Sequence, residues 1–94
     1  MIQSFRDEDT HQLFVKRSNK RWAAIAAVAI RKLDQIEASI NLTDLRIPPG
    51  NRLETLKRDR AGQHSIRIND QYRICFVWKD DGAHDVEITD YHRG

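Results

Sequence analysis

Three consecutive residues near the end of the sequence, Asp90, Tyr91 and His92, have side chains that can take part in proton transfer. The imidazole of His92 can act as an acid or a base near neutral pH, Asp90 can orient or ionise it, and Tyr91 can stack on a nucleobase. Glu54 and His64 are further candidate proton carriers. A histidine so close to the last residue is more often simply exposed, so these residues alone indicate only a possible site.

Basic side chains in the second half of the sequence could hold phosphate groups. Arg73 is expected at the centre of a strand, where a guanidinium can grip a phosphate through two parallel hydrogen bonds. The alternative is a surface ion pair with Glu87 or Glu54. The other cations that could contact an RNA backbone are Lys57, Arg58, Arg60 and Arg67. Ordinary solvated charges would explain these residues equally well.

The charges are unevenly distributed, although the net charge is only +2. Residues 16–32 contain six basic side chains and no acidic ones. Residues 46–73 contain seven basic and three acidic side chains, a balance of +4, whereas residues 80–90 contain five acidic side chains and no Lys or Arg. Clustered positive charge favours a polyanionic partner, most often nucleic acid. A solvated surface balanced by the acidic end is the alternative.

The composition argues against several other classes of protein. Cys75 is the only cysteine, so no intramolecular disulfide can form, and we expect it to be a small buried side chain. The histidines lack the paired spacing of a metal site, so we expect no metal and no cofactor. Residues 22–30 are too short an apolar stretch to span a membrane, and no signal peptide is visible. We therefore expect one cytoplasmic domain over residues 1–94.

Hydrophobic spacing predicts helices in the first half of the chain. Residues 1–5 are expected to form a short strand, and a short helix should follow the acidic residues 7–9 and continue to about Lys16. Apolar residues from Trp22 to Ile40 recur at steps of three and four, which predicts one long helix with a buried face. The sequence Pro-Pro-Gly at residues 48–50 ends the helical part.

After Arg52 the hydrophobic spacing changes to two, which predicts strands. We expect them around residues 53–57, 65–69 and 72–78, with a last strand ending at residues 89–92 and turns at residues 59–62, 69–70 and 80–82. This order predicts an α+β fold, in which an N-terminal strand and two main helices pack on one face of an antiparallel sheet. Arg67 and Arg73 should lie on the other face.

Several segments resemble the HigB family, within the RelE/ParE superfamily of type II toxins. They are residues 48–54 (PPGNRLE), 59–63 (DRAGQ), 65–71 (SIRINDQ), 73–76 (RICF) and 86–92 (VEITDYH), and the match covers nearly the whole chain. The resemblance implies a compact RelE-like fold and cleavage of mRNA in the ribosomal A site, by attack of a ribose 2′-OH on the adjacent phosphate. It also implies neutralisation by a HigA-type helix-turn-helix antitoxin, whose complex with the toxin binds operator DNA.

The resemblance also implies roles for individual residues. Arg73 takes the position of the strand arginine expected to contact the scissile phosphate. Residues 90–92 take the positions of the acid, aromatic and histidine associated with catalysis. Lys57 takes the position of the basic residue before the Asp-Arg turn.

Three positions depart from the family pattern. Some members have a catalytic histidine where this chain has Glu54, whose carboxylate could act as the base but also repels phosphate. The identity of the general base therefore stays open. Arg58 stands where many relatives have glycine and adds positive charge, and His64 stands where relatives often have an aromatic residue.

Two other functions remain as alternatives. A ParE-like toxin would inhibit DNA gyrase without cutting RNA, and a shared fold does not decide between the two. ParE-like chains generally lack the Asp-Tyr-His ending, which favours the ribonuclease. The third alternative is an inert binding domain that acts only with its antitoxin, and a non-toxic expression phenotype would favour it.

Overall fold

The computed structural model describes residues 1–90, so Tyr91 and His92 of the predicted catalytic set lie outside the described residues. Helix α1 spans Glu8–Lys16 and helix α2 spans Ala26–Ala38. The strands follow as β1 Glu54–Thr55, β2 His64–Arg67, β3 Tyr72–Lys79 and β4 Gly82–Asp90. Short 3₁₀ turns lie at Ala23–Ile25, Leu42–Arg46, Pro49–Asn51 and Arg58–Arg60. Within residues 1–90, no helix is both long and apolar enough to cross a membrane.

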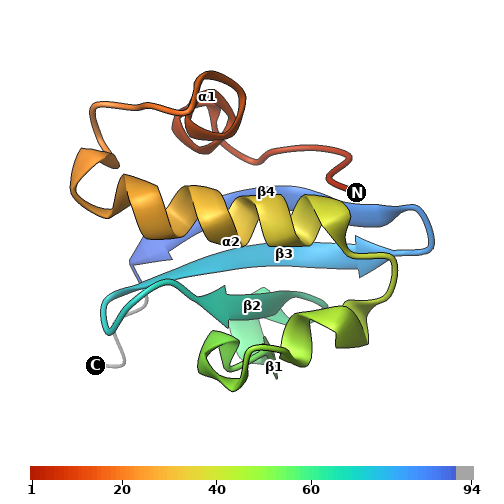
Figure 1. Cartoon of the computed structure of the whole chain (residues 1–94). Helices are drawn as coiled ribbons and strands as arrows, with labels where there is room; N and C mark the ends of the chain where they lie inside the picture. Colours follow the sequence, from red (N-terminus) through yellow and green to blue (C-terminus); the bar gives the residue numbers. More distant parts are fainter. Residues whose placement is uncertain (91–94) are drawn as a thin grey trace.

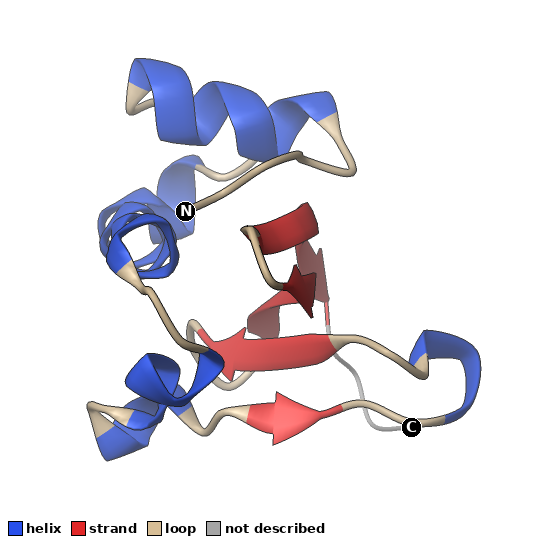
Figure 2. Ribbon diagram, turned by 90° about the vertical axis from the view of Figure 1, so that its right-hand side faces the viewer, coloured by secondary structure: helices blue, strands red, loops and turns tan. Residues whose placement is uncertain are grey.

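The helices form one layer and the sheet forms the other (Figure 1). All neighbouring strands are antiparallel, in the order β1-β2-β3-β4. Figure 2 shows α2 nearly end-on against one face of the sheet, with α1 crossing at the top. The predicted α+β fold, with two helices on one face of an antiparallel sheet, is confirmed.

The core lies between α2 and the sheet. Ala29, Leu33 and Ile36 of α2 are fully buried in one apolar cluster with Ile74 and Phe76 of β3. Their spacing of four and three residues puts them on one side of the helix, as the sequence predicted. This burial fixes α2 on the sheet and leaves the opposite sheet face for polar residues.

The predicted long helix is wrong in its extent. Trp22 is buried but precedes the 3₁₀ turn that leads into α2, and Ile40 is 83% exposed. The helix ends after Ala38 because Ser39 takes an extended backbone conformation, with φ −75° and ψ 133°. The apolar spacing therefore continued beyond the residues that are helical.

The expected N-terminal strand is reduced to two isolated bridges. Ile2 and Phe5 form parallel bridges to β4, and the Gln3 amide donates to the Ala83 carbonyl at 2.7 Å. The chain then enters α1, whose first turn is capped by the Asp7 carboxylate accepting from the Thr10 amide at 3.0 Å. The N-terminal segment therefore covers the outer edge of β4 without forming a regular strand.

Strand β1 is shorter than the strand expected at residues 53–57. Arg52 and Arg58 have positive φ angles, 46° and 58°, and bend the chain on both sides of it. Only Glu54 and Thr55 pair with β2. The turns expected at residues 59–62 and 80–82 are confirmed, as are the buried positions of Val86 and Ile88.

Candidate functional site

The sheet face opposite the helices carries two rows of mainly polar residues. Paired residues on neighbouring strands project to the same side of a sheet, so the register defines each row. The first row takes one residue from each strand: Glu54, Ser65, Cys75 and Glu87. The second row, two residues along β2, β3 and β4, is Arg67, Arg73 and Thr89.

Arg73 is not the surface arginine that the sequence predicted, because only 8% of it is exposed. Its Nε donates to Ser65 Oγ at 2.7 Å, and its Nη2 donates to the carbonyl oxygen of Arg52 at 2.6 Å. Strand β2 and the segment leading into β1 therefore each supply an acceptor for the guanidinium. These hydrogen bonds fix the plane of the group and compensate for its burial.

Glu54 is the carboxylate beside Arg73. Arg73 Nη2 and Glu54 Oε2 are 4.0 Å apart, and the Glu54 side chain is 33% exposed. Of the two ion pairs that the sequence left open for Arg73, the one with Glu54 is present in the structure. The site therefore combines a fixed cation with a partly accessible carboxylate.

A second arginine, Arg60, reaches the same face from the 3₁₀ turn at Arg58–Arg60. Its Nη1 donates to Glu87 Oε1 at 2.6 Å and to Gln63 Oε1 at 3.0 Å. Its Nη2 lies 3.5 Å from Thr89 Oγ1, and Thr89 is the register partner of Arg73. The two arginines are therefore neighbours on the sheet face.

Cys75 lies between these charged groups. Its thiol is fully buried, as expected, and burial raises its pKa from 9.0 to about 11. Burial is the largest cause of this pKa shift. Smaller effects come from the charges of four neighbouring side chains, Arg60, Glu87, Arg73 and Glu54. The thiol is therefore protonated at neutral pH. It adds no charge to the site and is a poor nucleophile.

The other predicted RNA-binding cations lie near the two arginines. Lys57 and Arg58 are exposed and lead into the turn that carries Arg60. Arg67 is the β2 register partner of Arg73 and forms an ion pair with Asp70. Lys57 and Arg58 therefore add positive charge near Arg60, and Arg67 adds it beside Arg73.

His64 lies on the other side of the sheet. It is the register partner of Phe76, with ring centroids 6.1 Å apart, and its Nδ1 is 3.2 Å from Thr55 Oγ1. Burial lowers the pKa of this imidazole. The sheet thus separates His64 from Arg73, and the structure does not bring these two predicted site residues together.

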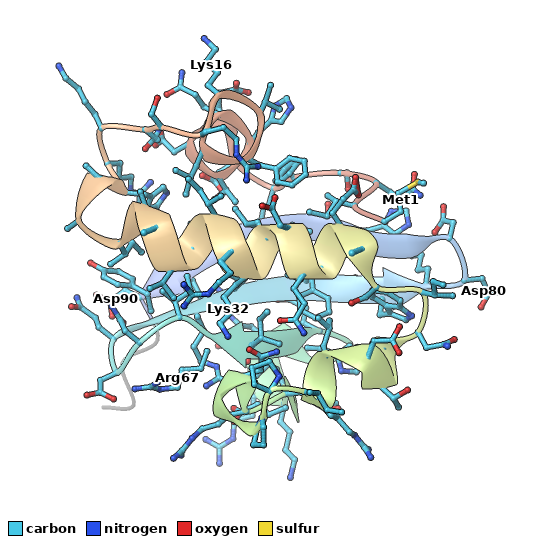
Figure 3. The ribbon with its side chains drawn as sticks, in the orientation of Figure 1. Met1, Lys16, Lys32, Arg67, Asp80 and Asp90 are labelled. Carbon is cyan, nitrogen blue, oxygen red and sulfur yellow. The ribbon has the colours of Figure 1, made fainter. Side chains whose placement is uncertain are left out.

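Asp90 is the last described residue and is exposed at the end of β4. Its register partner is Tyr72, which packs against Trp22 under the helices, and its Oδ2 accepts from Gln71 Nε2 at 3.0 Å. Figure 3 shows Asp90 and Arg67 at the same end of the molecule, opposite Asp80. Asp90 therefore lies one residue beyond the second row, and its pairing with Tyr72 places it on the helix side of the sheet, away from Arg73.

From the sequence Glu87 was expected only as a possible ion-pair partner of Arg73, whereas in the structure it pairs with Arg60. Its side chain is only 14% exposed, and besides Arg60 it has Arg6 Nε at 3.5 Å from its Oε2. The alternation along the last strand contained the signal, because Val86 and Ile88 face the core and Glu87 must face the other way. Among residues 1–90, no group of three or more His, Cys, Asp or Glu side chains could hold a metal ion.

Comparisons of structure identify the class of fold. The YoeB–YefM complex from Staphylococcus aureus contains a chain that superimposes with a TM-score of 0.61 at 17% identity, covering 98% of both chains. The YoeB/ParE toxin from Agrobacterium tumefaciens gives a TM-score of 0.50 at 19% identity, covering 97% of this chain and 98% of the other. The fold is that of RelE/YoeB-like toxins.

Sequence comparisons identify the family. The family described as "RelE-like toxin of type II toxin-antitoxin system HigB" matches residues 1–92. Toxin HigB-1 of Vibrio cholerae serotype O1 is 40% identical over 82 residues, which cover 85% of this chain and 86% of that protein. An uncharacterised protein of Haemophilus influenzae is 41% identical over 61 residues, 65% of this chain and 60% of its own length. This chain belongs to the HigB-like family of type II toxins.

Proposed function

We propose that this toxin is a ribosome-dependent, metal-independent endoribonuclease that cuts mRNA in the A site of the 30S subunit and so inhibits translation. The observation that carries the proposal is the buried Arg73 guanidinium, with Glu54 at 4.0 Å on the same sheet face. A fixed guanidinium can stabilise the charge that develops on phosphate, and a neighbouring carboxylate can accept a proton. Membership of the HigB-like family supports this reading.

In the proposed reaction, Glu54 accepts the proton of the ribose 2′-OH while the 2′ oxygen attacks the adjacent phosphorus. Arg73 binds the non-bridging oxygens and stabilises their negative charge. The bond from phosphorus to the 5′ oxygen then breaks, and His92 donates a proton to that leaving oxygen. The products are a 2′,3′-cyclic phosphate and a 5′-hydroxyl. Asp90 orients His92 and Tyr91 stacks on a base, as the family resemblance implies.

The ribosome has an essential part in this proposal, because the toxin offers few catalytic groups. Holding the mRNA in a reactive geometry can lower a barrier by several kcal/mol, up to roughly 7–11. Lys57, Arg58 and Arg67 would contact the RNA backbone beside the site. His64 is left out of the proposed site because it lies on the other side of the sheet.

We further propose a HigA-type helix-turn-helix antitoxin as the partner that neutralises the toxin, in a complex that binds operator DNA. The type II family supports an antitoxin partner, and the Staphylococcus aureus neighbour was solved as a complex of YoeB with YefM. A toxin that acts on translating ribosomes would work in the cytoplasm.

The direct test is cleavage of mRNA on purified ribosomes by variants at Arg73. We expect Arg73→Ala to lower the cleavage rate at least about a hundredfold, the usual effect of removing a group that stabilises transition-state charge. Arg73→Lys keeps the charge but not the planar fork and should be intermediate. Arg31→Ala, an exposed arginine on α2, is the control. Folded Arg73→Ala protein that cuts at the wild-type rate would disprove the assignment.

The same toxin can be tested in cells against the alternatives. Mapping of mRNA 5′ ends after expression should show new cuts within translated reading frames. DNA damage without such cuts would indicate a gyrase inhibitor, and normal growth without cuts would indicate an inert binding domain.

A further inference from the structure

We propose that Glu87 is a positioning residue that holds Arg60 in place to bind an RNA phosphate next to the phosphate bound by Arg73. This inference rests on the proposed ribonuclease function. The inference adds Arg60 to the site as a second anion-binding arginine, which Glu87 holds in place. The role of Glu87 would be indirect, because it would act only through Arg60.

The contacts of Arg60 are those of a fixed side chain. Glu87 and Gln63 both accept from Nη1, at 2.6 and 3.0 Å, which fixes the direction of the guanidinium plane. A charge-assisted hydrogen bond of this length is among the stronger contacts in proteins. Arg60 comes from a short 3₁₀ turn, so without these bonds its long side chain would have many more accessible rotamers.

The exposed fractions of the Glu87 and Arg60 side chains show which of the two faces the solvent. The Glu87 side chain is 14% exposed and that of Arg60 is 33% exposed, so the carboxylate lies beneath and the cation is presented outward. Arg6 adds a second cation at 3.5 Å from Glu87. The negative charge of Glu87 is therefore compensated inside the fold and repels an incoming phosphate less than an open carboxylate would.

The position of Arg60 relative to Arg73 suggests what it binds. Arg60 Nη2 lies 3.5 Å from Thr89 Oγ1, and Thr89 stands opposite Arg73 in the sheet. Directly opposed residues have Cβ atoms about 4.5–5.5 Å apart. Two cations held this close on one face, each beside a glutamate, suit a chain of repeated negative charges, and the RNA backbone of the proposed substrate is such a chain.

Glu87→Gln tests the inference, because it keeps the size of the side chain and removes the charge that holds Arg60. Cleavage of mRNA on purified ribosomes should show a KM raised about tenfold with kcat nearly unchanged, since a phosphate that does not react contributes uniform binding. The double variant Arg60→Ala/Glu87→Gln should be no worse than Arg60→Ala alone. Glu8→Gln, the same substitution at an exposed glutamate of α1, is the control and should leave KM near the wild-type value.

Each remaining result overturns one proposal or the other. Wild-type kinetics in Glu87→Gln, a loss confined to kcat, or additive losses in the double variant would disprove the positioning role. Glu87→Asp keeps the charge and replaces Glu87→Gln if that variant does not fold. Its KM should lie between those of the wild type and Arg60→Ala, and a KM as high as that of Arg60→Ala would also overturn the role. Failure of the wild-type toxin to cut mRNA on ribosomes would refute the ribonuclease proposal itself.

Discussion

Arg58 has a backbone conformation that suits glycine better than arginine. Its φ angle is 58°, in the left-handed region, where the Cβ of an L-residue crowds the backbone at a cost of about 1–2 kcal/mol. Its side chain is exposed beside the turn that carries Arg60. The arginine at this position therefore stands against the local conformational preference.

This conformation can be tested with two variants that remove the same charge. Arg58→Gly should have a free energy of unfolding about 0.5–1 kcal/mol higher than Arg58→Ala, because glycine avoids the left-handed penalty but loses some backbone entropy on folding. Urea unfolding measures the difference. Both variants should weaken RNA cleavage equally, since both lack the cation. Equal stability of the two variants would show that the left-handed conformation costs nothing at this position.

The sequence indicated which charged side chains belong to the candidate site, but it did not predict their contacts. Arg73, Arg60 and Glu54 were selected from residue type, expected strand position and family resemblance. The hydrogen bond from Arg60 to Glu87 joins residues 27 positions apart and depends on a non-repeating turn, whose path no periodicity describes. For the same reason the burial of Arg73 beneath the carbonyl of Arg52 could not be predicted from alternation along β3.

At the scale of elements, α1 completes the edge of the sheet. The amide of Val86 donates to the Ser4 carbonyl at 3.1 Å, and two residues later the amide of Ile88 donates to Thr10 Oγ1 at 3.1 Å. A side chain of α1 thus accepts the next hydrogen bond from the edge of β4, beyond the residues that pair with the N-terminal segment. This contact keeps an edge amide of β4 from being buried without an acceptor.

Removing that hydroxyl should destabilise the protein. Thr10→Val keeps the shape of the side chain and leaves the buried Ile88 amide without its acceptor, so we expect a loss of about 1–3 kcal/mol in the free energy of unfolding. Urea unfolding gives the total, and hydrogen exchange should become faster at the Ile88 amide. Thr43→Val, at an exposed threonine, is the control and should change little. An unchanged free energy in Thr10→Val would mean that another acceptor serves Ile88.

The elements differ in how well periodicity predicts them. Helix α2 and strands β3 and β4 bury one regular face, so their spacing of three to four or of two residues was readable in the sequence. The N-terminal segment and β1 are ordered by single contacts, such as the bridge from Phe5 to Val86. Such contacts leave no repeating pattern, and the sequence therefore predicted longer strands there than the structure has.

At the scale of the whole molecule, neighbouring acidic side chains mark one end of the sheet. Figure 3 shows Arg67 at one end and Asp80 at the other. The acidic end includes Asp80 and Asp81, in the hairpin between β3 and β4. A polyanion repels such an acidic end, so a small protein is oriented with this end turned away as it approaches.

With this orientation, the rate of association with the ribosome would depend on the position of a removed charge as well as on the change in net charge. Lys57→Gln and Lys79→Gln each remove one exposed lysine, the first beside the site and the second at the acidic hairpin. We expect Lys57→Gln to lower the association rate with mRNA-programmed ribosomes and to reduce the slope of log affinity against log salt by about one, the change for one phosphate contact. Lys79→Gln should change neither. Stopped-flow binding over a range of salt concentrations measures both quantities, and equal effects of the two variants would mean that net charge alone drives association.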